Sequence, residues 1–252
     1  MLIGPPTPHN CPHCNTLHQL KGYLSGNSFS AITWSDGHTH MPHAPKEVHA
    51  GRCAACKAII WHDELASQPP PDIPVDDDTY ELPGVPWLRQ LGPRELVEAV
   101  AKGEWRNVDD EQYLRLKLWH AMNHPLRQKQ MWWWQPEDVF SPEERTGLYT
   151  ANADALDALI AKQPASAGSL LMRADLRRMT GRFDEAQAML EQVTDEALLA
   201  RLSVVREGYA QRSTLPLPLV DPKPQTIPVP QPDRGWRTWP GRLFLWYVLR
   251  RW

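Results

Sequence analysis

The chain contains 252 residues, of which 42% are hydrophobic, so it is long and apolar enough for one large or two ordinary globular domains. Its net charge at pH 7 is −3, and the only basic segment is 215–252, which disfavours broad nucleic-acid binding by the folded parts. The chain opens without a signal-peptide pattern and has no apolar run of the roughly 18–20 residues that cross a bilayer, so we expect a cytoplasmic protein.

Residues 1–67 have the composition of a small β-rich module. Apolar runs rich in β-branched and aromatic residues predict strands at 29–34, 47–52 and 57–63. Between the first two, Asp36 and Gly37 form the dipeptide typical of a tight hairpin turn, and we expect that turn to be an exposed tip.

All four cysteines lie in this module, as two pairs with two residues between their members. Thiols stay reduced in the cytoplasm, so this spacing indicates metal binding in preference to a disulfide framework or a redox pair. Zn²⁺ takes four thiolates in a tetrahedron, and a C-x-x-C turn can point both sulfurs inward. The predicted ligands of one structural Zn²⁺ ion are Cys11, Cys14, Cys53 and Cys56. With Pro12 and the β-rich context, the pairs make the segment resemble a zinc ribbon, although the spacer between them is longer than usual in that family.

Segment 68–86 is acidic and rich in proline. Such a composition cannot bury enough apolar surface to fold alone, so we expect an extended linker and a domain boundary here.

From residue 87 to residue 214 the hydrophobic period becomes helical. Pro93 suits a first helical turn, and a second helix is predicted to end at Pro125. A third helix should begin after Ser141, which stands three residues before Glu144, as a capping box requires.

Segment 169–193 resembles a tetratricopeptide repeat. The small Ala174 and Ala186 would let two antiparallel helices approach closely, and Gly181 would supply the reversal between them. One helical hairpin cannot bury its own apolar face, so the neighbouring helices should pack on it as a short α-solenoid. The resemblance implies an α+β protein in which a zinc-ribbon module precedes a tetratricopeptide-like domain. This combination resembles uncharacterised bacterial proteins of that architecture, which imply no particular activity.

After Ser213 the chain forms a proline-rich arm, 215–234, followed by a tail, 235–252, that is rich in tryptophan and arginine. The tail has three alternative roles: docking on the chain itself or on a second copy in a homodimer, lying on an anionic membrane surface, or entering a groove of another protein. The candidate docking residues are Trp236, Trp239, Arg242, Phe244, Trp246, Tyr247, Arg250 and Arg251.

Two further features invite a functional interpretation. His38, His40 and His43 beside Asp36 have a pattern that could hold a second, catalytic metal, but an exposed hairpin tip without a substrate pocket is the preferred interpretation. The run 132–134 consists of three tryptophans, which we expect to be mainly core residues rather than an exposed anchor for a partner.

No phosphate-binding glycine loop, nucleophile elbow or H-E-x-x-H helix is present, so we do not expect an enzyme. The predicted function is that of a non-catalytic adaptor with one structural zinc and a helical surface that binds a protein partner. The alternatives are nucleic-acid binding through the ribbon, if its few lysines and arginines gather on one face, and peripheral membrane attachment through the tail.

Overall fold

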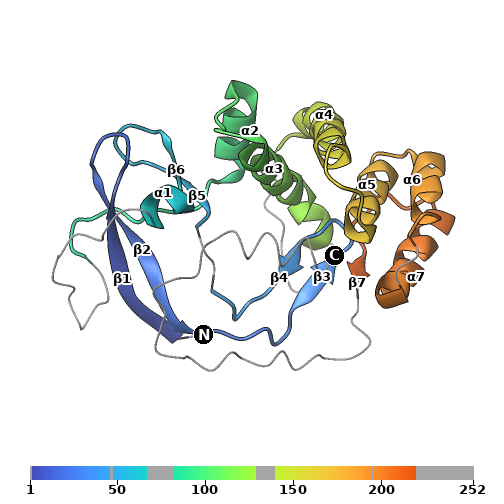
Figure 1. Cartoon of the computed structure of the whole chain (residues 1–252), viewed down its shortest axis with the longest axis horizontal. Coiled ribbons are helices and arrows are strands. Elements are labelled where there is room, and N and C mark those ends of the chain that lie inside the picture. The colour runs from blue at the N-terminus through green and yellow to red at the C-terminus, as the bar shows by residue number, and fades with distance from the viewer. Residues whose placement is uncertain (1, 46–47, 67–81, 129–139, 194–195, 220–252) are drawn as a thin grey trace. The chain divides into compact units, whose positions relative to one another are not determined.

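The computed structural model describes residues 2–45, 48–66, 82–128, 140–193 and 196–219 (Figure 1). The chain divides into two compact units: Met1–Ala31 with Met41–Gly92, and Ile32–His40 with Pro93–Trp252. Small antiparallel β elements make up the N-terminal part and helices follow, so the expected α+β mixture is confirmed.

Two β-ribbons and one short helix form the first unit. Strand β1 (Leu2–Asn10) pairs antiparallel with β2 (Leu17–Ser25), and β5 (Ala50–Arg52) pairs antiparallel with β6 (Ile59–Trp61). Helix α1 (His62–Ala66) follows β6 directly. The core of this unit consists of Cys11, Cys53, Ile60, Leu65 and Leu88.

Strand β1 was not predicted from the sequence, because three prolines interrupt it. The structure accommodates them through an irregularity: the pairing register with β2 shifts between Gly4 and Thr7, so that Pro5 and Pro6 have no partner in the ladder. Since proline cannot donate a hydrogen bond, it is tolerated in strands at such irregularities and at sheet edges.

Of the predicted linker, residues 82–86 are described, and they are tied to β2. The side chain of Gln19, which is 2% exposed, accepts a hydrogen bond from the amide nitrogen of Leu82 over 2.9 Å and donates one to the carbonyl oxygen of Val85 over 2.6 Å. Leu82 itself is buried, so this end of the linker belongs to the folded unit.

Among the described residues of the second unit, most lie in six helices, which stand side by side in chain order (Figure 1). Their bounds are α2 Pro93–Lys102, α3 Val108–Gln128, α4 Pro142–Ala161, α5 Ala167–Met179, α6 Phe183–Leu190 and α7 Glu196–Ala210. The predicted capping box is confirmed: Ser141 Oγ accepts from the Glu144 amide, and the Glu144 carboxylate accepts from the Ser141 amide.

The prediction that the second helix ends at Pro125 is wrong, since α3 continues to Gln128. A proline inside a helix removes one backbone hydrogen bond and costs about 3 kcal/mol, so the last turn needs tertiary support. Arg127 supplies it, because its guanidinium is 2% exposed, pairs with the carboxylate of Asp36 and donates to the carbonyl oxygen of His120 over 2.6 Å.

The expectation that the Asp-Gly turn is an exposed tip is also wrong. Strands β3 (Ile32–Trp34) and β4 (Thr39–His40) form a hairpin that belongs to the helical unit, and Asp36 at its turn is 0% exposed. The turn is buried because Asp36 finds two partners on α3: its carboxylate pairs with Arg127, and its carbonyl oxygen lies 3.1 Å from His120 Nε2.

The start of the proline-rich arm completes the hairpin's sheet. Strand β7 (Pro218–Leu219) pairs with β3, giving the order β4-β3-β7. Arg178 of α5, which is 0% exposed, joins these segments: it donates to Asp175, to Ser35 Oγ and to the carbonyl oxygen of Leu215. Of the predicted arm, residues 215–219 are described, and β7 and Arg178 anchor them to the fold.

Candidate metal centre

The two C-x-x-C segments form loops with the same backbone geometry, one at the turn of each β-ribbon in the first unit. In the first, the Cys11 amide donates to the Thr16 carbonyl over 2.8 Å. In the second, the Cys53 amide donates to the Ala58 carbonyl over 3.0 Å. In each loop the residue after the second cysteine has a positive φ, 60° at Asn15 and 63° at Lys57. Asparagine adopts this conformation readily, whereas lysine does so at some cost.

These loops bring all four predicted ligands together. One ligand atom from each of Cys11, Cys14, Cys53 and Cys56 lies within 4.8 Å of the others. The sulfurs of Cys11 and Cys56 are 3.8 Å apart, and those of Cys14 and Cys53 are 3.6 Å apart. A tetrahedral ion with metal–sulfur bonds of about 2.3 Å requires edges of about 3.8 Å. The prediction that these four residues form one metal-binding group is therefore confirmed in its geometry.

Each loop contributes one buried and one exposed cysteine to the cluster. Cys11 and Cys53 are buried, whereas Cys14 and Cys56 are exposed. Burial raises the pKa of the Cys11 thiol to about 12, whereas hydrogen bonds from the Thr16 side chain and backbone lower the pKa of Cys14 to about 6. A metal binds thiolates, so loading this site must release the proton that burial holds on Cys11.

A histidine that the sequence did not single out as a site residue lies against the sulfurs. His18 of β2 is 1% exposed, and its Nε2 lies 3.3 Å from Cys53 Sγ. Burial lowers the pKa of His18, so the ring is neutral and can donate its Nε2 proton to a thiolate. His13, by contrast, directs its Nε2 to the carbonyl oxygen of Ile59 at 3.2 Å. The sequence signal for His18 was its place four residues after Cys14, on the strand that leaves the loop.

The second set of candidate metal ligands, the histidines near Asp36, does not form a compact cluster of this kind. Within the described ranges, no second group of three or more histidine, cysteine or carboxylate ligands reaches the compactness of the cysteine cluster. His38 and His40 belong to the helical unit, whereas His43 belongs to the first unit. The tryptophans at 132–134 and the eight candidate docking residues of the tail lie outside the described residues.

In the described part of the chain, no helix has both the length and the apolar character needed to cross a membrane. No protein-family model, curated protein or solved structure matches the chain.

Proposed function

We propose that the chain is a non-catalytic adaptor for protein–protein interaction, whose N-terminal unit is held together by one structural Zn²⁺ ion. The observation that carries this proposal is the cluster of four sulfurs within 4.8 Å of one another. Four thiolates suit the borderline-soft Zn²⁺ and its tetrahedral preference. A site filled by four protein ligands leaves no position for a water or substrate, so its role is structural.

The helical unit supplies the proposed partner surface. Helices α5 and α6 support the tetratricopeptide-like interpretation, because Ala174 and Ala186 are both 0% exposed and Gly181 between the helices has φ +84°. They pack with Val205 and Tyr209 of α7 in one hydrophobic cluster. Short helical arrays of this kind bind extended peptides or helices of other proteins.

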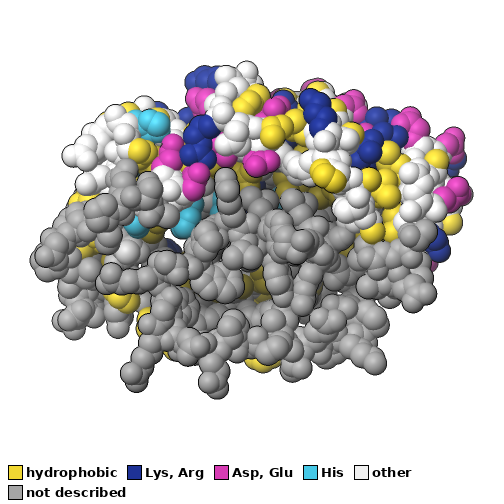
Figure 2. All heavy atoms as spheres, viewed as in Figure 1, with side chains coloured by type: hydrophobic (Ala, Val, Ile, Leu, Met, Phe, Trp, Pro, Cys, Tyr) yellow, Lys and Arg dark blue, Asp and Glu magenta, His cyan; other side chains and the backbone are white. Residues whose placement is uncertain are grey.

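Surface charge favours a protein partner over a nucleic acid. On the visible face of the helices in Figure 2, basic and acidic side chains are interspersed. Several arginines of the helical unit are paired with carboxylates, as Arg177 is with Asp157 over 2.9 Å. A phosphate backbone would need an uninterrupted basic face instead.

Elemental analysis of purified full-length protein tests the zinc part of the proposal. We expect one zinc per chain in the wild type, and a clear loss of zinc in Cys53→Ser. The matched control is Ala55→Ser, which adds the same hydroxyl to the same loop at an exposed position that carries no ligand. A wild-type protein without stoichiometric zinc, or equal metal content in the two variants, contradicts the assignment.

Affinity capture from the native cell tests the adaptor part. Tagged wild-type protein is compared with the tag alone and with a variant carrying Asp184→Lys and Gln187→Lys, two exposed positions on α6. We expect a defined protein to be enriched by the wild type and reduced by the α6 variant, with zinc content unchanged. Enrichment of nothing beyond the tag control would refute a stable protein partner.

A further inference from the structure

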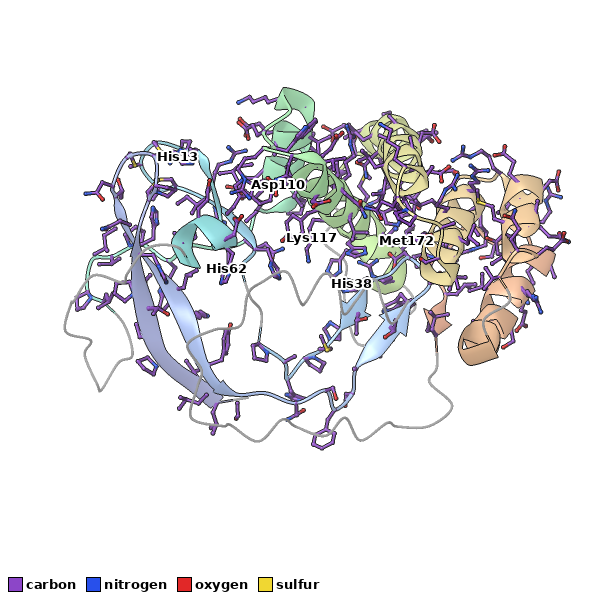
Figure 3. The ribbon with its side chains drawn as sticks, in the orientation of Figure 1. His13, His38, His62, Asp110, Lys117 and Met172 are labelled. Atoms are coloured by element: carbon purple, nitrogen blue, oxygen red, sulfur yellow. The ribbon has the colours of Figure 1, made fainter. Side chains whose placement is uncertain are left out.

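In the helical unit, basic side chains of the β3–β4 hairpin and of α3 meet in one half-buried place. The rings of His38 and His120 lie edge to face with centroids 5.2 Å apart. Lys117 precedes His120 by three residues, so the two side chains lie on the same face of α3. All three side chains are half-buried. Figure 3 shows Lys117 below α3, with His38 and Met172 nearby.

The turn of the hairpin is built for close approach to α3 and α5. Gly37 has φ +83°, and a Cβ on it would lie 2.7 Å from Met172 Cε and 3.6 Å from His120 Nε2. The positive φ therefore favours glycine here, and a side chain would also have to displace the end of the flexible Met172. The ion pair of Asp36 with Arg127 and the contact of His120 with the Asp36 carbonyl oxygen hold the same turn against α3, which places His38 beside His120.

These basic groups have no acidic counterpart in the described part of the chain. The carboxylate of Asp36 is used by Arg127, and that of Asp175 is used by Arg178. Lys117 contacts the ring of Tyr113, with its Nζ 5.4 Å from the centroid, and forms no ion pair with a described residue. A half-buried ammonium without a counter-ion is costly, since neither water nor a carboxylate fully compensates its charge.

The protonation of all three groups reflects this missing negative charge. Burial lowers the pKa of Lys117, and it lowers the pKa of His120 well below its usual range. Burial and then the charges of Arg127 and Lys117 lower the pKa of His38 to about 2. A bound anion would favour the charged form of each group, so binding and proton uptake would be coupled.

We propose that His38, Lys117 and His120 form a binding site for one anionic group of a small molecule, either a phosphate or a carboxylate. Lys117 provides the fixed positive charge, and His38 donates a ring N–H after taking up a proton. His120 keeps its Nε2 on the carbonyl oxygen of Asp36, so its Nδ1 is the atom that takes up a proton. Hydrogen bonds from charged donors to an anion are the strong ones, and three of them around one group define a site.

Among the neighbouring titratable groups, the arginines and Tyr149 keep their charge state between pH 5.5 and 7.5. The arginines are paired with the two buried carboxylates, and burial raises the pKa of Tyr149, which therefore stays neutral. The groups around the site are Asp36, His38 and His40 of the hairpin, Lys117, His120, His124 and Arg127 of α3, Tyr149 of α4, and Asp175 and Arg178 of α5. Proton uptake on anion binding thus falls to the histidines.

Calorimetry on the zinc-loaded full-length protein tests the proposal with sulfate and oxalate as probes, because both keep their charge across pH 5.5–7.5. Chloride at equal ionic strength is the control. We expect saturable binding of one anion. For each proton taken up, the Kd should fall up to tenfold with every unit by which the pH is lowered. Tighter sulfate binding identifies a phosphate ligand, and tighter oxalate binding a carboxylate ligand. Weak heat that chloride reproduces overturns the proposal.

Variants and a spectroscopic readout locate the site. Lys117→Met should raise the Kd at least tenfold, whereas Lys102→Met, on the exposed face of α2, should leave it unchanged. If Lys117→Met fails to fold, His38→Gln and the NMR titration of His38 in the wild type decide. A saturating anion should raise the pKa of His38 from about 2 into the range of pH 5.5–7.5, where the bound state takes up its proton. Wild-type affinity in the folded variants, or an unmoved His38 titration, refutes the site.

Discussion

Removing the charge of Asp36 should destabilise the helical unit strongly, although the residue lies far from the helices in sequence. The side chain of Asp36 is 0% exposed and that of its partner Arg127 is 3% exposed, so Asp36→Asn leaves a guanidinium buried without a counter-ion. Breaking a buried pair in this way typically costs about 3–5 kcal/mol. Because a domain of ordinary stability has about 5–15 kcal/mol in total, the loss would be large. For a unit of this size it corresponds to a decrease in Tm on the order of 10 °C.

Thermal and urea unfolding, followed by the far-ultraviolet helix signal, measure this loss. The matched control is Glu98→Gln, which breaks the Glu98–Lys102 pair on α2, where the side chains are 49% and 58% exposed. This exposed pair contributes little, so the control should change the free energy of unfolding by less than about 0.5 kcal/mol. The double variant Asp36→Asn with Arg127→Gln should recover part of the loss, since no unpaired charge remains. If Asp36→Asn stays within 1 kcal/mol of the wild type, the hairpin is not an integral part of the helical unit and our reasoning is wrong.

Three other predictions concern the metal centre and pH. His18→Leu should weaken zinc binding about 10- to 100-fold in competition with a chelator, because it removes the hydrogen-bond donor to Cys53. His18→Gln, which keeps a donor, and the control His9→Gln should not weaken zinc binding. Equal affinities of His18→Leu and the wild type would exclude a role for that donor. The pKa values of His38 and His120 are lowered in the folded state, so below about pH 6.5 the folded chain binds fewer protons than the unfolded chain. The free energy of unfolding should therefore decrease by up to about 1.4 kcal/mol for each histidine with every unit by which the pH is lowered. An unchanged urea midpoint from pH 7 to pH 5 would contradict this. Chelation of the metal should abolish the near-ultraviolet signal of the buried Trp61 while the far-ultraviolet helix signal persists, and retention of the tryptophan signal would show that the first unit folds without metal.

Features that depend on a few neighbouring residues were predictable from the sequence. The two C-x-x-C loops form as their spacing suggests, because each loop closes through hydrogen bonds within six residues. The capping box at Ser141 is likewise local, since its two hydrogen bonds join residues three positions apart. In these cases the chemistry of one turn decides the conformation, whatever surrounds it.

The sequence could not identify the partners of its buried charged residues. Asp36 and Arg127 are 91 positions apart, and nothing in the sequence distinguishes Arg127 from the other arginines as that partner. The same holds for Arg178, which reaches Ser35 across 143 positions. A buried charge needs an opposite charge at hydrogen-bonding distance, and only the packing of helices against the hairpin brings one there.

The sequence by itself therefore determined which four cysteines come together, the helix that begins after Ser141 and the change from β-rich to helical structure. The tertiary structure alone decided that the Asp-Gly hairpin belongs to the helical unit, that α3 passes through Pro125, and that His18 contacts a ligand sulfur. The physical reason is that turns and caps are stabilised by neighbours in the chain, whereas the burial of polar groups is stabilised by residues that only the fold brings together.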